Sequence, residues 1–120
     1  MMQSKNRRTS TTAFEGNLKK ALTEMIMLFL LSEKDCFIGE LTAAIKNRSK
    51  GKLSIVFPYG AVYRMQNDGF IEEVFKQKAP DGRKRQYYRI TDAGRSHLKE
   101  LLDFYQEFTQ GVSAILSANQ

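Results

Sequence analysis

Several residue types are scarce in this sequence, and each shortage excludes a class of protein. The 120 residues include one cysteine, Cys36, which rules out an internal disulfide and suits a reducing compartment. There is no tryptophan, and proline occurs only at Pro58 and Pro80. The longest apolar run, residues 25–31, is too short to span a bilayer. The basic N-terminus lacks the apolar segment of a secretory signal. A cytoplasmic protein is therefore expected.

Positive charge is concentrated in the middle of the chain, whose formal net charge is +6. Residues 46–95 carry twelve basic and five acidic side chains, a surplus of +7. Residues 1–45 carry +1, and residues 96–120 carry −2. A focused basic surface is typical of phosphate binding. On charge alone, a nucleic-acid partner and a solvated basic face without a partner are both open.

The first part of the chain predicts a basic arm followed by an apolar helix. Residues 1–12 lack apolar periodicity and are expected to form a flexible arm. Its Lys5, Arg7 and Arg8 either follow a DNA backbone or groove, or remain solvated. From Phe14 onward, apolar residues recur at helical spacing and widen until the predicted helix is apolar on nearly all sides. Such a helix needs other elements packed on more than one of its sides, and a second subunit would provide part of this packing.

The middle of the chain predicts two short helices. Phe37 and Leu41 belong to an amphipathic segment that ends in a basic run. The next helix begins either at Ser54 or at Pro58, because a proline inside a helix deletes a hydrogen bond but is tolerated in its first turn. Gly69 provides the usual stop.

A hairpin follows these helices. Two strand-like runs, residues 70–78 and 85–90, are joined by Ala-Pro-Asp-Gly at 79–82, which favours a turn. The order of elements is that of a winged helix-turn-helix domain over residues 13–91. The predicted fold class is therefore α+β, mostly α with a two-stranded β-hairpin wing, followed by a long C-terminal dimerisation helix.

In this plan the third helix enters the major groove of DNA, and the basic hairpin tip faces phosphates. Val62 and Met65 lie three residues apart and are assigned to the core, with either Pro58 or Tyr59 continuing this face. The opposite face, which includes Ala61, is assigned to DNA, and Arg64 is expected to pair with a guanine or a phosphate. The residues expected to contact DNA are Ser54, Phe57, Tyr59, Gly60, Tyr63, Arg64, Lys76, Arg83, Lys84 and Arg85.

The last helix is predicted over residues 92–118, with Thr91 as its N-cap. Its apolar residues follow steps of 3, 4, 3, 4 and 3 from Leu98 to Ile115, which is a heptad-like seam. At 1.5 Å per residue this helix is about 40 Å long and overhangs a small head. Packing within one chain is the alternative to a homodimer. The expected dimer contacts are Leu22, Met25, Phe29, Leu98, Leu101, Leu102, Tyr105, Phe108, Val112 and Ile115.

The stretch from Leu18 to about Leu116 resembles the PadR family of transcriptional regulators, in its short form. The match rests on residues 22–33 (LTEMIMLFLLSE), on Phe37 with Glu40-Leu41, on residues 54–71 (SIVFPYGAVYRMQNDGFI) and on residues 83–95 (RKRQYYRITDAGR). The resemblance implies a homodimeric regulator that binds double-stranded DNA. The sequence departs from the family at Ile38-Gly39, where Gly-Tyr is usual, and at Gly60, where many members have proline.

Two functions are left open. The first is a sequence-specific repressor that binds a palindromic operator as a homodimer. The second is a winged-helix module that binds another protein. Release by a small aromatic effector is a further hypothesis, with Met25, Phe29, Tyr105 and Phe108 as candidate pocket residues, although these side chains also suit an ordinary core. No acid–base pair, metal-ligand cluster or phosphate loop indicates an enzyme or a cofactor.

Overall fold

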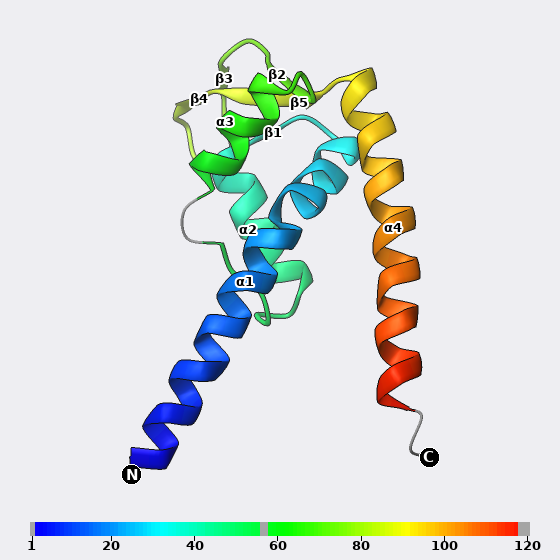
Figure 1. The fold of residues 1–120 in the computed structure, drawn as a ribbon. Helices are drawn as coiled ribbons and strands as arrows, with labels where there is room; N and C mark the ends of the chain where they lie inside the picture. Colours follow the sequence, from blue (N-terminus) through cyan, green and yellow to red (C-terminus); the bar gives the residue numbers. More distant parts are fainter. Residues whose placement is uncertain (1, 56–57, 118–120) are drawn as a thin grey trace.

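The computed structural model describes residues 2–55 and 58–117 and shows a small head from which two long helices diverge (Figure 1). The helices are α1 Met2–Glu33, α2 Ile38–Arg48, α3 Tyr59–Asn67 and α4 Asp92–Leu116. The strands are β1 Cys36–Phe37, β2 Ile71–Glu73, β3 Gln77–Lys78, β4 Lys84–Arg85 and β5 Tyr87–Ile90. This order confirms the predicted α+β class, mostly helical with a hairpin wing and a long C-terminal helix.

The core of the head forms around the C-terminal half of α1, which contacts α2, α3, α4 and β5. Met27, Leu28 and Leu31 of α1 are almost fully buried, together with Leu41 of α2 and Met65 of α3. Full burial of an aliphatic side chain of this size stabilises a fold by about 1.5–3 kcal/mol. Because neighbours surround this half of α1, it can be apolar on nearly every side.

Helix α1 starts earlier than the sequence suggested. The segment expected to be a flexible arm continues the helix from Met2 through residue 12. It contains neither glycine nor proline, so no residue in it interrupts a helical backbone. In Figure 1 the N-terminal half of α1 projects away from the head. Phe14 and Leu18 on this part of the helix are exposed.

Strand β5 is the centre of a three-stranded antiparallel sheet with the order β1-β5-β2. The sequence analysis did not predict β1, a two-residue strand in which Cys36 pairs with Tyr88. Strands β3 and β4 form a separate ladder farther out on the wing. The wing is therefore a hairpin whose strands are interrupted, and not the two continuous strands expected at 70–78 and 85–90.

A bulge separates the two ladders of the wing. Between their paired residues, the incoming strand has three residues, 74–76, and the outgoing strand has two, 86–87. The Gln86 side chain donates a hydrogen bond to the Val74 carbonyl across this gap. A bulge bends its strand and redirects side chains. Phe75 lies inside it and is 90% exposed.

The predicted wing turn and the predicted cap of α4 are both present. The Ala79 N–H donates to the Arg83 carbonyl at 2.8 Å, and Gly82 adopts a φ of +86°, which favours glycine. The Thr91 hydroxyl accepts a hydrogen bond from the Gly94 N–H at 3.0 Å. Both features are specified by a few adjacent residues, which is why sequence alone located them.

Most of α4 extends beyond the head (Figure 1). Its apolar side chains are exposed from Leu102 to the end of the helix, with Phe108 60% and Ile115 75% exposed. The radius of gyration is 17.1 Å, larger than the roughly 14 Å typical of a compact domain of this length. Within residues 2–55 and 58–117, no helix has the length and apolar character needed to cross a membrane.

Candidate functional site

The structure places the start of α3 at the later of the two predicted positions. Pro58 is the N-cap and Tyr59 is the first helical residue. The Val62 N–H donates to the Pro58 carbonyl at 3.1 Å. This arrangement keeps the proline out of the helix interior, where it would remove a hydrogen bond. Ser54 therefore precedes the helix and is exposed, whereas the predicted contact Phe57 lies outside the described residues.

Helix α3 has one buried and one exposed face. Val62 and Met65 are buried, as predicted. Ala61 is also buried, with 4% exposure, so its assignment to the DNA-facing side was wrong. It lies only about 100° around the helix from Val62, within reach of the same core. The exposed face carries Tyr59, Gly60, Tyr63 and Arg64.

The Arg64 side chain passes Gly60 on α3 and reaches Glu24 of α1. Its Nε donates a hydrogen bond to Glu24 Oε2 at 2.8 Å. A Cβ built on Gly60 would be 3.5 Å from Arg64 Nη1, so the guanidinium passes over the surface that glycine leaves open. Glu24 was not predicted as a partner of Arg64, because no local spacing connects residues that are forty positions apart.

The tip of the wing holds exposed basic side chains and one carboxylate. Lys76, Arg83 and Lys84 are exposed, as their predicted role requires. Asp81 accepts hydrogen bonds from the Arg85 guanidinium at 2.6 Å and from the Arg83 N–H at 3.0 Å. Both bonds lower the pKa of Asp81, and the bond from Arg85 has the larger effect. Asp81 therefore remains ionised and offsets part of the positive charge at the tip.

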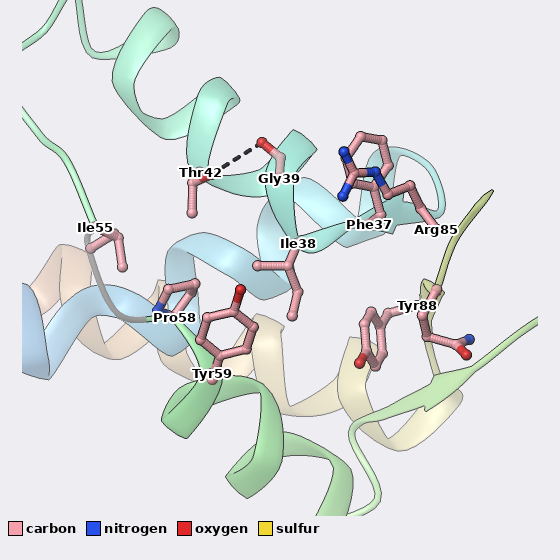
Figure 2. A pocket seen from close by; sticks show the side chains of 10 residues that line it. Phe37, Ile38, Gly39, Thr42, Ile55, Pro58, Tyr59, Arg85 and Tyr88 are labelled. Carbon is pink, nitrogen blue, oxygen red and sulfur yellow. Dashed lines mark hydrogen bonds between the residues drawn. The ribbon is translucent and has the colours of Figure 1, made fainter. Parts of the chain in front are cut away.

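Arg85 borders a hollow of about 360 Å³ between α2, the start of α3 and the wing (Figure 2). Its guanidinium lies over the Phe37 ring, 5.4 Å from the centroid, and Figure 2 shows Ile38 between Tyr59 and Tyr88. Arg85 Nε is buried and has no hydrogen-bond partner among the described residues. In this structure Arg85 thus attaches the wing to Phe37 of β1, the N-cap of α2, in addition to the phosphate contact expected of it.

A second hollow, of about 440 Å³, lies between α1 and the start of α3. Lys19, Lys20 and Arg64 line it, together with Ser54 and Gly60. Neither lysine was predicted to lie near α3, because both belong to the first helix. Basic side chains therefore border the exposed face of α3 on the α1 side as well as on the wing.

Part of the positive charge of residues 46–95 is neutralised elsewhere. Arg48 pairs with Glu33 at 2.6 Å, and Arg89 pairs with Asp35 at 2.8 Å. The hydrogen bond from Arg48 lowers the pKa of Glu33. Ion pairs between exposed side chains are screened by solvent and contribute little to stability. They make the basic surface smaller than the sequence count of +7 indicated.

The predicted dimer residues differ in how far the single chain buries them. Leu98 is buried in the core of its own head, and Leu101 packs partly against that core. Leu22 and Met25 are half-buried. The exposed members are Phe29, Leu102, Tyr105, Phe108, Val112 and Ile115. Phe104, which the prediction omitted, is exposed as well and stacks on Phe108 with the ring centroids 5.8 Å apart.

Cysteine and histidine serve packing in this structure. Burial raises the pKa of the Cys36 thiol to about 11, so the thiol stays protonated near neutral pH. His97 stacks on Phe70 with the ring centroids 4.2 Å apart. In the described part of the chain, no three His, Cys, Asp or Glu side chains are grouped so that they could hold a metal ion.

Comparisons with known proteins agree with this architecture. Residues 27–100 match the model of the transcriptional regulator PadR-like family. An uncharacterized protein of Lysinibacillus sphaericus is 34% identical over 86 residues, which cover 70% of this chain and 78% of that protein.

Two solved structures illustrate the similarity in fold. A PadR-like transcriptional regulator of Bacillus cereus is 26% identical with a TM-score of 0.72, covering 84% of this chain and 97% of its own. A PadR family transcriptional regulator of Eggerthella lenta covers 98% of both chains with a TM-score of 0.76, at 19% identity. The second similarity extends over the long helices as well as the head.

Proposed function

Because this chain belongs to the PadR-like family of transcriptional regulators, we propose that it is a cytoplasmic repressor that binds a palindromic DNA operator as a homodimer. One observation carries the proposal: α3 exposes Tyr59, Gly60, Tyr63 and Arg64 next to the basic wing. In winged helix-turn-helix proteins such a helix reads base edges in the major groove, and basic side chains around it contact phosphates.

Contacts to bases and to phosphates are assigned to different residues of this surface. The exposed face of α3 reads bases, with Arg64 as its charged member. Lys76, Arg83 and Lys84 on the wing contact the phosphate backbone. Lys19 and Lys20 border the other side of α3 and extend this phosphate-binding surface onto α1. The phosphate contacts supply affinity and its salt dependence, and the α3 contacts supply sequence preference.

The exposed apolar side chains of α4 support the homodimer. Phe104, Phe108 and Ile115 are exposed in a single chain, and burying each against a second copy contributes about 1.5–3 kcal/mol. Exposed Phe14 and Leu18 on the projecting part of α1 offer a second apolar surface. A two-fold dimer presents two α3 helices to successive major grooves, about 34 Å apart, and therefore matches a palindromic site.

An aromatic effector remains a hypothesis attached to this dimer. Its candidate contacts are Met25, Phe29, Tyr105 and Phe108, and they do not line either hollow described above. Phe29, Tyr105 and Phe108 are exposed in the single chain, so we infer that a second chain would complete a pocket at these residues.

Selection from a random-sequence duplex library tests the proposed function. We expect the protein to enrich one palindromic sequence and to lose affinity steeply with salt, because phosphate contacts release counterions. Footprinting should show two protected half-sites, one helical turn apart. If the protein binds no duplex even at low salt, the proposal is wrong, and the protein-binding alternative is favoured.

Replacing Lys84 with alanine separates backbone binding from base reading. We expect similar losses of affinity for the enriched duplex and for a scrambled duplex, with a salt slope shallower by about one unit. Binding titrations over a salt series measure both effects. Lys99→Ala is the matched control, because Lys99 is an exposed lysine on α4, away from the wing. A change in base preference on removing Lys84 would contradict its assignment to phosphate.

A further inference from the structure

Helix α3 contains one charged side chain, Arg64, which forms a hydrogen bond with a residue of another helix. Arg64 remains 54% exposed while its Nε donates to Glu24 Oε2 at 2.8 Å, and the Glu24 side chain is 27% exposed. The pair connects α1 to the exposed face of α3. The bond to Glu24 engages one N–H donor of the Arg64 guanidinium and leaves the others available for DNA.

A guanidinium has five N–H donors: one on Nε and two on each Nη nitrogen. The bond to Glu24 uses the Nε donor of Arg64. The Nη1 atom lies beside Gly60, at the surface where any larger residue would place its side chain. The two terminal nitrogens therefore keep the fork of parallel donors that pairs with O6 and N7 of a guanine.

Glu24 is well placed to restrain Arg64. It lies on α1 between buried Thr23 and the fully buried pair Met27 and Leu28, so the core anchors its backbone. A free arginine at a DNA surface can turn to the nearest phosphate, which carries no sequence information. A carboxylate also repels phosphates, so Glu24 lowers general affinity for DNA. By restraining Arg64 and lowering general affinity for DNA, Glu24 would favour sequence preference over binding strength.

We propose that Glu24 is a positioning residue for sequence recognition, which holds the Arg64 guanidinium across Gly60 so that its terminal nitrogens read one base pair. Glu24 acts through Arg64 and does not contact the base. The inference rests on the proposed function, since it requires α3 to enter the major groove.

A double-mutant cycle tests this inference, with Glu24→Gln, Arg64→Ala and the double variant compared with the unmodified protein. Dissociation constants are measured for the enriched duplex, for its single base-pair variants and for a scrambled duplex. We expect Glu24→Gln to reduce discrimination at one base-pair position by about tenfold. Arg64→Ala should remove discrimination at the same position. In the Arg64→Ala background, Glu24→Gln should change discrimination no further.

Two further variants separate geometry from charge. Glu15→Gln is the matched control, because Glu15 also pairs with a basic residue of α1, Lys19, at 2.8 Å. It should alter affinity for all duplexes together and preserve base preference. Glu24→Asp keeps the negative charge but withdraws the carboxylate by one methylene. It should lose base preference as Glu24→Gln does. Thermal unfolding of each variant shows whether the fold is retained.

The possible results distinguish this inference from the proposed function. If Glu24→Gln behaves like Glu15→Gln, Glu24 supplies only charge and the inference is wrong. If Glu24→Gln strengthens binding to the enriched duplex while keeping its base preference, Glu24 withholds Arg64 from DNA, which also overturns the inference. Either result leaves sequence-specific binding intact. Failure of the unmodified protein to enrich any sequence would instead overturn the proposed function, and this inference with it.

Discussion

Replacing Phe108 with glutamate is expected to convert the proposed dimer into monomers and to weaken binding to the enriched duplex at least a hundredfold, about 3 kcal/mol. Phe108 is 60% exposed in the single chain, so the head should fold without it. In a dimer, an unpaired carboxylate buried in an apolar seam costs several kcal/mol. A monomer holds only one half-site and loses the contribution of the other. Sedimentation equilibrium and binding titrations measure the two effects.

The matched control is Gln110→Glu, which adds the same charge to the same helix. Gln110 is exposed and lies two residues beyond Phe108, about 200° around α4 and away from the apolar seam. This variant should remain dimeric and keep its affinity for the enriched duplex. If Phe108→Glu were also dimeric at micromolar concentration, the exposed side of α4 would not be the dimer interface.

Replacing Gly94 with alanine should destabilise the head by about 3 kcal/mol or more, because overpacking against backbone is hard to relieve. A Cβ at this position would be 2.1 Å from the Phe70 carbonyl oxygen and 2.8 Å from Ile90 Cγ1. That carbonyl also accepts a hydrogen bond from the Thr91 N–H at 3.0 Å, just before α4 begins. The first turn of α4 must therefore move away from the sheet. Denaturant unfolding at a fixed protein concentration measures the loss.

Gly111→Ala is the control on the same helix. A Cβ at Gly111 meets no atom within 4 Å in the described structure. Alanine should therefore stabilise the helix by up to about 1 kcal/mol, through its higher helix propensity. Equal destabilisation by the two substitutions would show that the effect at Gly94 does not come from the close approach of α4 to Phe70, because Gly111 has no such neighbour.

The residues proposed to contact DNA could be predicted only in part. Tyr63 and Arg64 are exposed on α3 as expected, because burial of Val62 and Met65 determines which face points outward. The width of the buried face could not be judged, so Ala61 was assigned to the wrong side. Lys19 and Lys20 gave no sequence signal, because their relation to α3 depends on how α1 packs against it.

Sequence alone determined the features that depend on a few neighbouring residues. Gly69 ends α3 with a φ of +79°, the 79–82 turn closes the wing, and Thr91 caps α4. Local backbone preferences and hydrogen bonds specify each of these, so short-range patterns suffice. The order of helices and strands follows from them, and with it the winged helix-turn-helix plan.

Tertiary structure alone decided how distant segments meet. The pairing of β1 with β5, the attachment of Arg85 to Phe37 and the bond between Arg64 and Glu24 each join residues that are far apart in the chain. Packing of α1 against α3 brings the last pair together, and no local preference encodes that contact. The candidate DNA-reading surface was therefore located by sequence, whereas the position of its charged side chain was determined by the fold.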